Sequence, residues 1–207
     1  MRTQTSLVDL EELFYLALNA TQTGRYEQAI NYLRQVLEQE PGNGKAFYLL
    51  GAVHAQLGLY ERAIEEMQQA VEREPQLEAA HFQLGMLHLH TGNFKAAETA
   101  WEKLNVLGNN HYLYLFKEGL IALSNDQYDE CIRLLNIGIE QNQINESLNQ
   151  DMQNIIASTQ NLLSTNDNTD ESSNPDDMQD ASLDTATGKR IILSAYQKNQ
   201  TPNDSSH

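Results

Sequence analysis

The sequence predicts an all-α fold, a solenoid of stacked helix-turn-helix hairpins. The main observation is a spacing of 34 residues that repeats from about residue 10 to residue 143. Three columns of this repeat hold glycine (24, 58, 92), an aromatic residue (26, 60, 94, 128) and alanine or cysteine (29, 63, 97, 131). Such a period, with these residue types at fixed offsets, is typical of helical hairpins that stack on one another.

Each repeat is expected to fold as a first helix, a short turn and a second helix. Glycine at the turn suits the left-handed backbone that ends a helix, and Pro41 and Pro75 cannot continue the second helices. Gly51, Gly85 and Gly119 recur on the first helices, where a missing side chain lets two helices approach closely. One hairpin could not bury this face, whereas several stacked hairpins can.

The predicted organisation begins with a lead-in at residues 1–9. Four repeat units follow at 10–43, 44–77, 78–111 and 112–143, then a capping helix at 144–164 and an acidic disordered tail at 165–207. The fourth unit is degenerate, since Asp126 replaces the turn glycine and Gly138 stands inside the second helix. Terminal repeats are often atypical in this way.

The segment after the repeats has one apolar helical face. Its members are Ile144, Leu148, Met152, Ile155, Ile156, Thr159, Leu162 and Leu163. The other face is rich in asparagine and glutamine, which predicts a helix that covers the last repeat. Residues 165–177 have no aromatic or branched apolar side chain, so we expect disorder there, with one short apolar island at 189–196.

Composition excludes several classes of function. The chain holds 29 acidic and 13 basic residues, a formal net charge of −16, and no basic patch to neutralise phosphates. Nucleic acid and anionic membrane surfaces are therefore poor partners. The single cysteine, Cys131, allows no internal disulfide. Without a signal-peptide core or an apolar run of roughly 18–20 residues, we expect a soluble, cytoplasmic protein.

The second repeat carries the family resemblance. Leu50-Gly51, Gly58, Tyr60, Ala63, Ala70 and Pro75 stand where the tetratricopeptide repeat has leucine and glycine, a turn glycine, an aromatic residue, alanines and a closing proline. The chain resembles that family over about two-thirds of its length. The resemblance implies a right-handed solenoid with a non-catalytic, protein-binding role and no cofactor.

The resemblance also implies a concave groove lined by the first helix of each repeat. The groove residues expected to bind a partner are Phe14, Leu18, Tyr48, Phe82, Met86, Leu89, Phe116 and Leu120. An aromatic residue recurs at one offset in all four units, which predicts an apolar strip for a hydrophobic peptide or helix. The alternative is that the capping helix, the tail or a second copy buries this strip.

The predicted function is an interaction scaffold or adaptor. The basic clamp of chaperone-binding tetratricopeptide domains is absent, because Phe14, Leu18, Tyr48, Ala52 and Phe82 occupy its positions. The first repeat is also similar to class II chaperones of type III secretion, which keep a hydrophobic client soluble. A regulatory subunit of an enzyme or assembly complex is a further alternative. The sequence does not specify the oligomeric state.

No constellation for catalysis, cofactor binding or metal binding stands out. His54, His81 and His88 lack the further ligands that zinc needs, so we expect them to serve packing. Cys131 occupies the alanine column without an evident base, which indicates a buried small residue. In the tail, a short motif of Ile191, Ile192, Leu193 and Tyr196 would dock on a partner or fold back into the groove, or it is a chance apolar patch.

Overall fold

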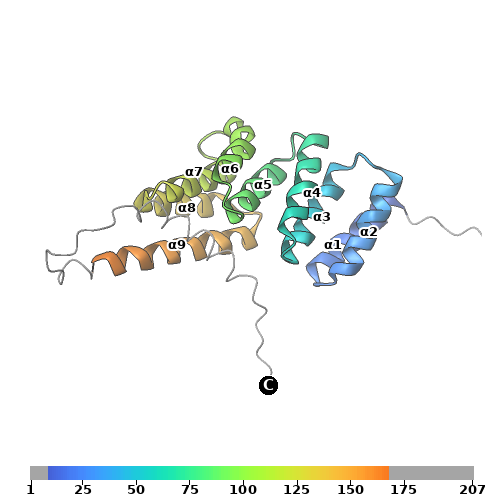
Figure 1. Ribbon diagram of the computed structural model, residues 1–207, viewed down its shortest axis with the longest axis horizontal. Helices are drawn as coiled ribbons and strands as arrows, with labels where there is room; N and C mark the ends of the chain where they lie inside the picture. The colour runs from blue at the N-terminus through green and yellow to red at the C-terminus, as the bar shows by residue number, and fades with distance from the viewer. Residues whose placement is uncertain (1–8, 168–207) are drawn as a thin grey trace, which may run out of the picture. The chain divides into compact units, whose positions relative to one another are not determined.

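The computed structural model describes residues 9–167, and within this range every regular element is a helix. The elements in Figure 1 are α1 (Leu10–Gln22), α2 (Tyr26–Gln39), α3 (Gly44–Gln56), α4 (Tyr60–Arg73), α5 (Glu78–His90), α6 (Phe94–Trp101), the 3₁₀ helix η1 (Glu102–Leu107), α7 (Tyr112–Ser124), α8 (Tyr128–Gln141) and α9 (Glu146–Asp167). The chain forms two compact units, which meet in sequence between Leu87 and His88.

The first unit contains two hairpins, α1 with α2 and α3 with α4. Helix α3 also packs against α2 and α1. The core between them consists of Leu13, Ala17, Leu33, Val36, Ala46, Leu49 and Leu50. These residues lie on the inward stripes of amphipathic helices, so neither hairpin alone would cover them.

The turns within the hairpins follow the prediction. Gly24, Gly58 and Gly92 have φ values of 71°, 72° and 78°, the left-handed region that glycine enters without a Cβ clash. Asp126 takes the same conformation at φ 59° in the fourth repeat, where its carboxylate accepts a hydrogen bond from the Tyr128 hydroxyl. The aspartate therefore preserves the turn that the lost glycine makes in the other repeats.

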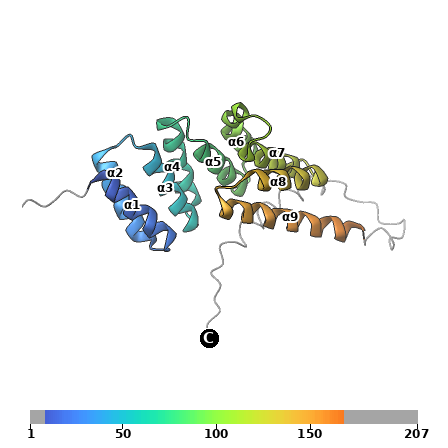
Figure 2. The ribbon, with the colours of Figure 1, turned by 180° about the vertical axis from the view of Figure 1, so that it is seen from behind.

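The second unit is built around α8, which lies between α7 and α9 in both views (Figures 1 and 2). Ahead of it, α6 ends at Trp101 and continues as the 3₁₀ helix η1, so this repeat's second helix is shorter than those in the first unit. Helix α9 buries Leu148, Met152, Ile155, Ile156 and Thr159, as the apolar face predicts. Ile144 differs, since it precedes α9 and is 81% exposed.

Asn142 explains why α9 begins where it does. Its side-chain amide donates to the Asn145 carbonyl and to Asn149 Oδ1, while its Oδ1 accepts from the backbone N–H groups of Ile144 and Asn145. The Asn149 amide returns a hydrogen bond to the Asn142 carbonyl. This network shapes the turn from α8 into α9, and it leaves Ile144 pointing outward.

Several sequence-based predictions concern residues outside the described range. They are the lead-in at 1–8 and most of the tail, including the island at 189–196 with Ile191, Ile192, Leu193 and Tyr196. Residues 165–167, which were expected to begin the tail, belong to α9. Of the described helices, none combines the length and the apolar character that crossing a membrane requires.

Candidate peptide-binding pocket

The predicted groove residues fall into two groups in the structure. Leu18 is exposed, and Phe14 and Tyr48 are half-buried. The other five are no more than 2% exposed: Phe82, Met86, Leu89, Phe116 and Leu120. The structure therefore corrects the expectation of a continuous accessible strip, and accessible side chains are confined to the first two repeats.

Phe116 shows the physical reason for this correction. A Cβ atom placed on Gly138 of α8 would lie 2.5 Å from two ring carbons of Phe116, so the ring fills the space that this glycine leaves. The Tyr112 ring meets it edge-on, with 5.9 Å between centroids. Phe116 thus belongs to the α7–α8 interface, and Gly138 is a packing feature of the degenerate repeat.

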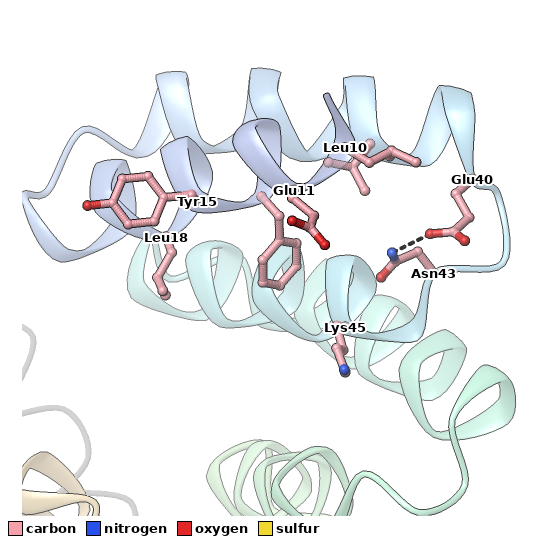
Figure 3. A pocket seen from close by; sticks show the side chains of 9 residues that line it. Leu10, Glu11, Tyr15, Leu18, Glu40, Asn43 and Lys45 are labelled. Atoms are coloured by element: carbon pink, nitrogen blue, oxygen red, sulfur yellow. Dashed lines mark hydrogen bonds between the residues drawn. The ribbon is translucent and has the colours of Figure 1, made fainter. Parts of the chain in front are cut away.

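The accessible residues of α1 line a pocket of about 390 Å³ in the first unit (Figure 3). Its apolar lining comes from Leu10, Phe14, Tyr15 and Leu18 of α1, and from Val36 of α2. Leu10, Phe14 and Leu18 are four residues apart, so they share one stripe of the helix. Because Tyr15 is 68% exposed and Leu18 is 39% exposed, an apolar ligand could cover both.

The remaining lining of this α1–α3 pocket is polar: Glu11, Glu40, Asn43 and Lys45. In Figure 3, Tyr15 and Leu18 lie at one end, whereas Glu40 and Asn43 lie at the other. The Asn43 amide donates to Glu40 Oε2 at 2.6 Å. Asn43 also caps α3, since its Oδ1 accepts from the Ala46 N–H at 2.9 Å. The cap therefore fixes the Glu40 carboxylate at one end of the pocket.

Phe14 and Leu18 are the predicted residues that this pocket brings together, and Tyr48 is not part of its lining. Sequence reasoning missed Leu10, Tyr15, Val36, Glu40 and Asn43. The spacing of Leu10 from Phe14 was a visible signal, because residues four apart lie on one helix face. The contributions of α2 and of the turn before α3 were hidden, since the repeat pattern assigns the groove to first helices alone.

Two of the histidines, His54 and His81, are buried and contact polar groups of neighbouring segments. His54 of α3 is buried, and its Nδ1 lies 2.5 Å from Glu66 Oε2 of α4. Burial raises the pKa of Glu66, and the hydrogen bond to His54 opposes that rise. His81 Nε2 lies 3.1 Å from the Pro75 carbonyl oxygen. Residues 9–167 contain no group of three or more side chains that could hold a metal ion.

Cys131 is fully buried on α8, in the alanine column of the repeat. Burial raises the pKa of its thiol to about 12, while a hydrogen bond with Thr159 of α9 works in the opposite direction. The thiolate, which is the nucleophilic form, is therefore scarce near neutral pH. Its place between two packed helices is that of a small core residue.

Comparisons with known proteins agree on the fold. Two family models described as tetratricopeptide repeat match residues 20–81 and 60–104. None of the curated proteins matches the chain. Among solved structures, MamA is 20% identical with a TM-score of 0.56, and the alignment covers 67% of this chain and 81% of MamA.

Two further structures extend over nearly the whole chain. YrrB, described as a tetratricopeptide protein with an unusual peptide-binding site, is 15% identical with a TM-score of 0.55, covering 95% of this chain and 94% of YrrB. A tetratricopeptide repeat protein from Parabacteroides merdae is 16% identical with a TM-score of 0.59. The alignment covers 96% of this chain and 77% of the Parabacteroides merdae chain. These likenesses show the fold. The family matches identify tetratricopeptide repeats within residues 20–104 of this chain, and its paired helices agree with that fold.

Proposed function

We propose that this chain is a non-catalytic interaction scaffold that binds a hydrophobic peptide or helix of a partner protein in the α1–α3 pocket. The observation that carries the proposal is the accessible stripe of Leu10, Phe14 and Leu18 on α1, which continues onto Tyr15. Apolar side chains gathered in a pocket are a common mark of a protein-binding surface. The pocket also joins two predicted groove residues.

The spacing of this stripe favours a short extended or helical segment as ligand. A hydrophobic peptide would cover Leu18 and Tyr15 and would meet Phe14 and Val36 at the base of the pocket. Partner recognition in this manner uses apolar anchors for affinity and a few polar groups for orientation. Neither the secretion-type chaperone nor the regulatory subunit has a specific observation in its favour.

The test is affinity capture of proteins from a native lysate with the intact chain and with Leu18→Glu. Leu18 is exposed, so the charge should leave the fold intact while it places an unpaired carboxylate against the ligand. Leu59→Glu is the matched control, because Leu59 is 45% exposed and does not line the pocket. We expect a partner that the intact chain and Leu59→Glu retain and Leu18→Glu loses. Capture of the same proteins by all three chains would contradict the proposal.

A further inference from the structure

We infer that the α1–α3 pocket selects a segment of a partner protein that carries basic residues next to branched aliphatic residues. This inference rests on the proposed function and specifies the chemistry of the ligand. In Figure 3, Tyr15 and Leu18 lie at one end of the pocket, Glu11 lies near its middle, and Glu40 lies at the other end, on the same side as Leu10. The aliphatic residues would contact Phe14, Leu18 and Tyr15, and the basic residues would meet Glu11 and Glu40.

The two carboxylates can both accept hydrogen bonds from a ligand. Glu11 is exposed and has no hydrogen-bond or ion-pair partner within residues 9–167. Across the same range, the Glu40 carboxylate has one such partner, the Asn43 amide. An ionised carboxylate offers about four acceptor positions, so Glu40 retains most of its capacity. Because Asn43 holds it in place, little side-chain ordering is needed when a cation binds.

The charge balance near the pocket favours a cation over an anion. The lining residues carry two carboxylates, those of Glu11 and Glu40, and one ammonium group, that of Lys45. Helix α1 contains no basic residue. The formal charge of the whole chain is −16, which attracts cationic segments and repels anionic ones during encounter. This arrangement is opposite in sign to the basic clamp that binds a terminal carboxylate.

The experiment titrates the full chain with two fluorescent peptides. The first, Lys-Arg-Ile-Ile-Leu-Ser-Ala-Tyr, has the sequence of residues 189–196, which places two basic residues before three aliphatic ones. In the second, both basic residues are replaced by glutamate. We expect the basic peptide to bind about three- to tenfold more tightly at low salt, since charge-assisted contacts at the surface are modest. High salt should reduce the difference.

Three variants separate the pocket from the general charge of the chain. Glu11→Gln should weaken binding of the basic peptide about two- to threefold, whereas Lys45→Gln should strengthen it about twofold. Glu12→Gln is the matched control, because Glu12 is also exposed on α1 but does not line the pocket. It should leave the affinity within measurement error.

The failures of the two proposals are distinguishable. Equal binding of both peptides, or equal effects of Glu11→Gln and Glu12→Gln, would overturn the inference on charge. If Leu18→Glu still abolished binding of both peptides, the proposed function would survive that result. No binding of either peptide would overturn the inference, and binding that Leu18→Glu leaves unchanged would overturn both.

Discussion

The α3/α4 and α7/α8 hairpins have the same repeat register but bury different residues. Tyr48 of α3 and Phe116 of α7 are equivalent positions, 68 residues apart, and Ala70 and Gly138 are equivalent on the second helices. With alanine at 70, Tyr48 stays half-buried, whereas Phe116 is fully buried against Gly138. Where the second helix has glycine in place of alanine, the aromatic residue of the first helix is fully buried and no longer partly exposed.

The same pair of hairpins differs in polar contacts. His54 and Glu66 form a buried pair across α3 and α4, and their equivalents in α7 and α8 are Ala122 and Leu134. At the hairpin ends, Glu74 with Pro75 follows α4, whereas the hydrogen-bonded Asn142 follows α8. The difference at the hairpin ends changes how the next element is connected, while the helix pairing itself is retained.

The largest predicted effect comes from removing the two aromatic side chains. Phe116→Ala should lower the free energy of unfolding by about 3–5 kcal/mol, because it empties a filled core position. Tyr48→Ala should cost about 1 kcal/mol, since part of that side chain is already in water. Denaturant unfolding followed by circular dichroism measures both. Equal losses would contradict the difference in burial.

Removal of the Asn142 side chain should have the next largest effect. Asn142→Ala is expected to cost about 2 kcal/mol, because it removes the side-chain hydrogen bonds that join α8 to α9. Asn136→Ala is the matched control on the exposed face of α8, with an expected change below about 0.5 kcal/mol. The same unfolding experiment compares them, and similar losses would show that the network does not hold the turn.

A methyl group at Gly138 should cost less, because a gain in helix propensity offsets part of the clash. Gly138→Ala is expected to lower the free energy of unfolding by about 1–2 kcal/mol, as its Cβ would lie 2.5 Å from the Phe116 ring. In a chain that already carries Phe116→Leu, the added Gly138→Ala should cost less free energy of unfolding than it costs in the intact chain. Additive effects in this double-mutant cycle would rule out the proposed contact.

The smallest effect concerns pH and comes from Glu66 of α4, the partner of His54. Burial raises the pKa of Glu66 above 4.5 in the folded chain, so the folded state binds this proton more tightly than the unfolded state. The free energy of unfolding therefore falls as pH rises from 4.5 through the raised pKa. Glu66→Gln should remove this contribution. Unfolding curves at several pH values check it, and parallel pH profiles for the two chains would contradict it.

The fold could be predicted from the sequence because it depends on columns of like residues. The period of 34 residues indicated the paired helices, and the turn glycines indicated their left-handed backbone. The burial of Phe116 could not be read from its column, since it depends on Gly138 of the facing helix. Gly138 looked like a defect when considered by itself.

The candidate pocket was predictable in part for the same reason. Phe14 and Leu18 lie at repeat offsets that face the groove, so their column identified them. Glu40 and Asn43 reach the pocket through the turn between α2 and α3, and the hydrogen bond between them depends on the capping geometry of α3. Such local geometry does not follow from periodicity.

The most direct test of the account measures how tightly a captured partner binds the intact chain, Leu18→Glu and Leu59→Glu. If the α1–α3 pocket is the binding surface, Leu18→Glu should bind the partner at least about tenfold more weakly, a loss of about 1.4 kcal/mol in binding free energy. Leu59→Glu, with a similar exposed leucine away from the pocket, should bind within about twofold of the intact chain. Equal affinities for all three chains would contradict the assignment of partner binding to this pocket.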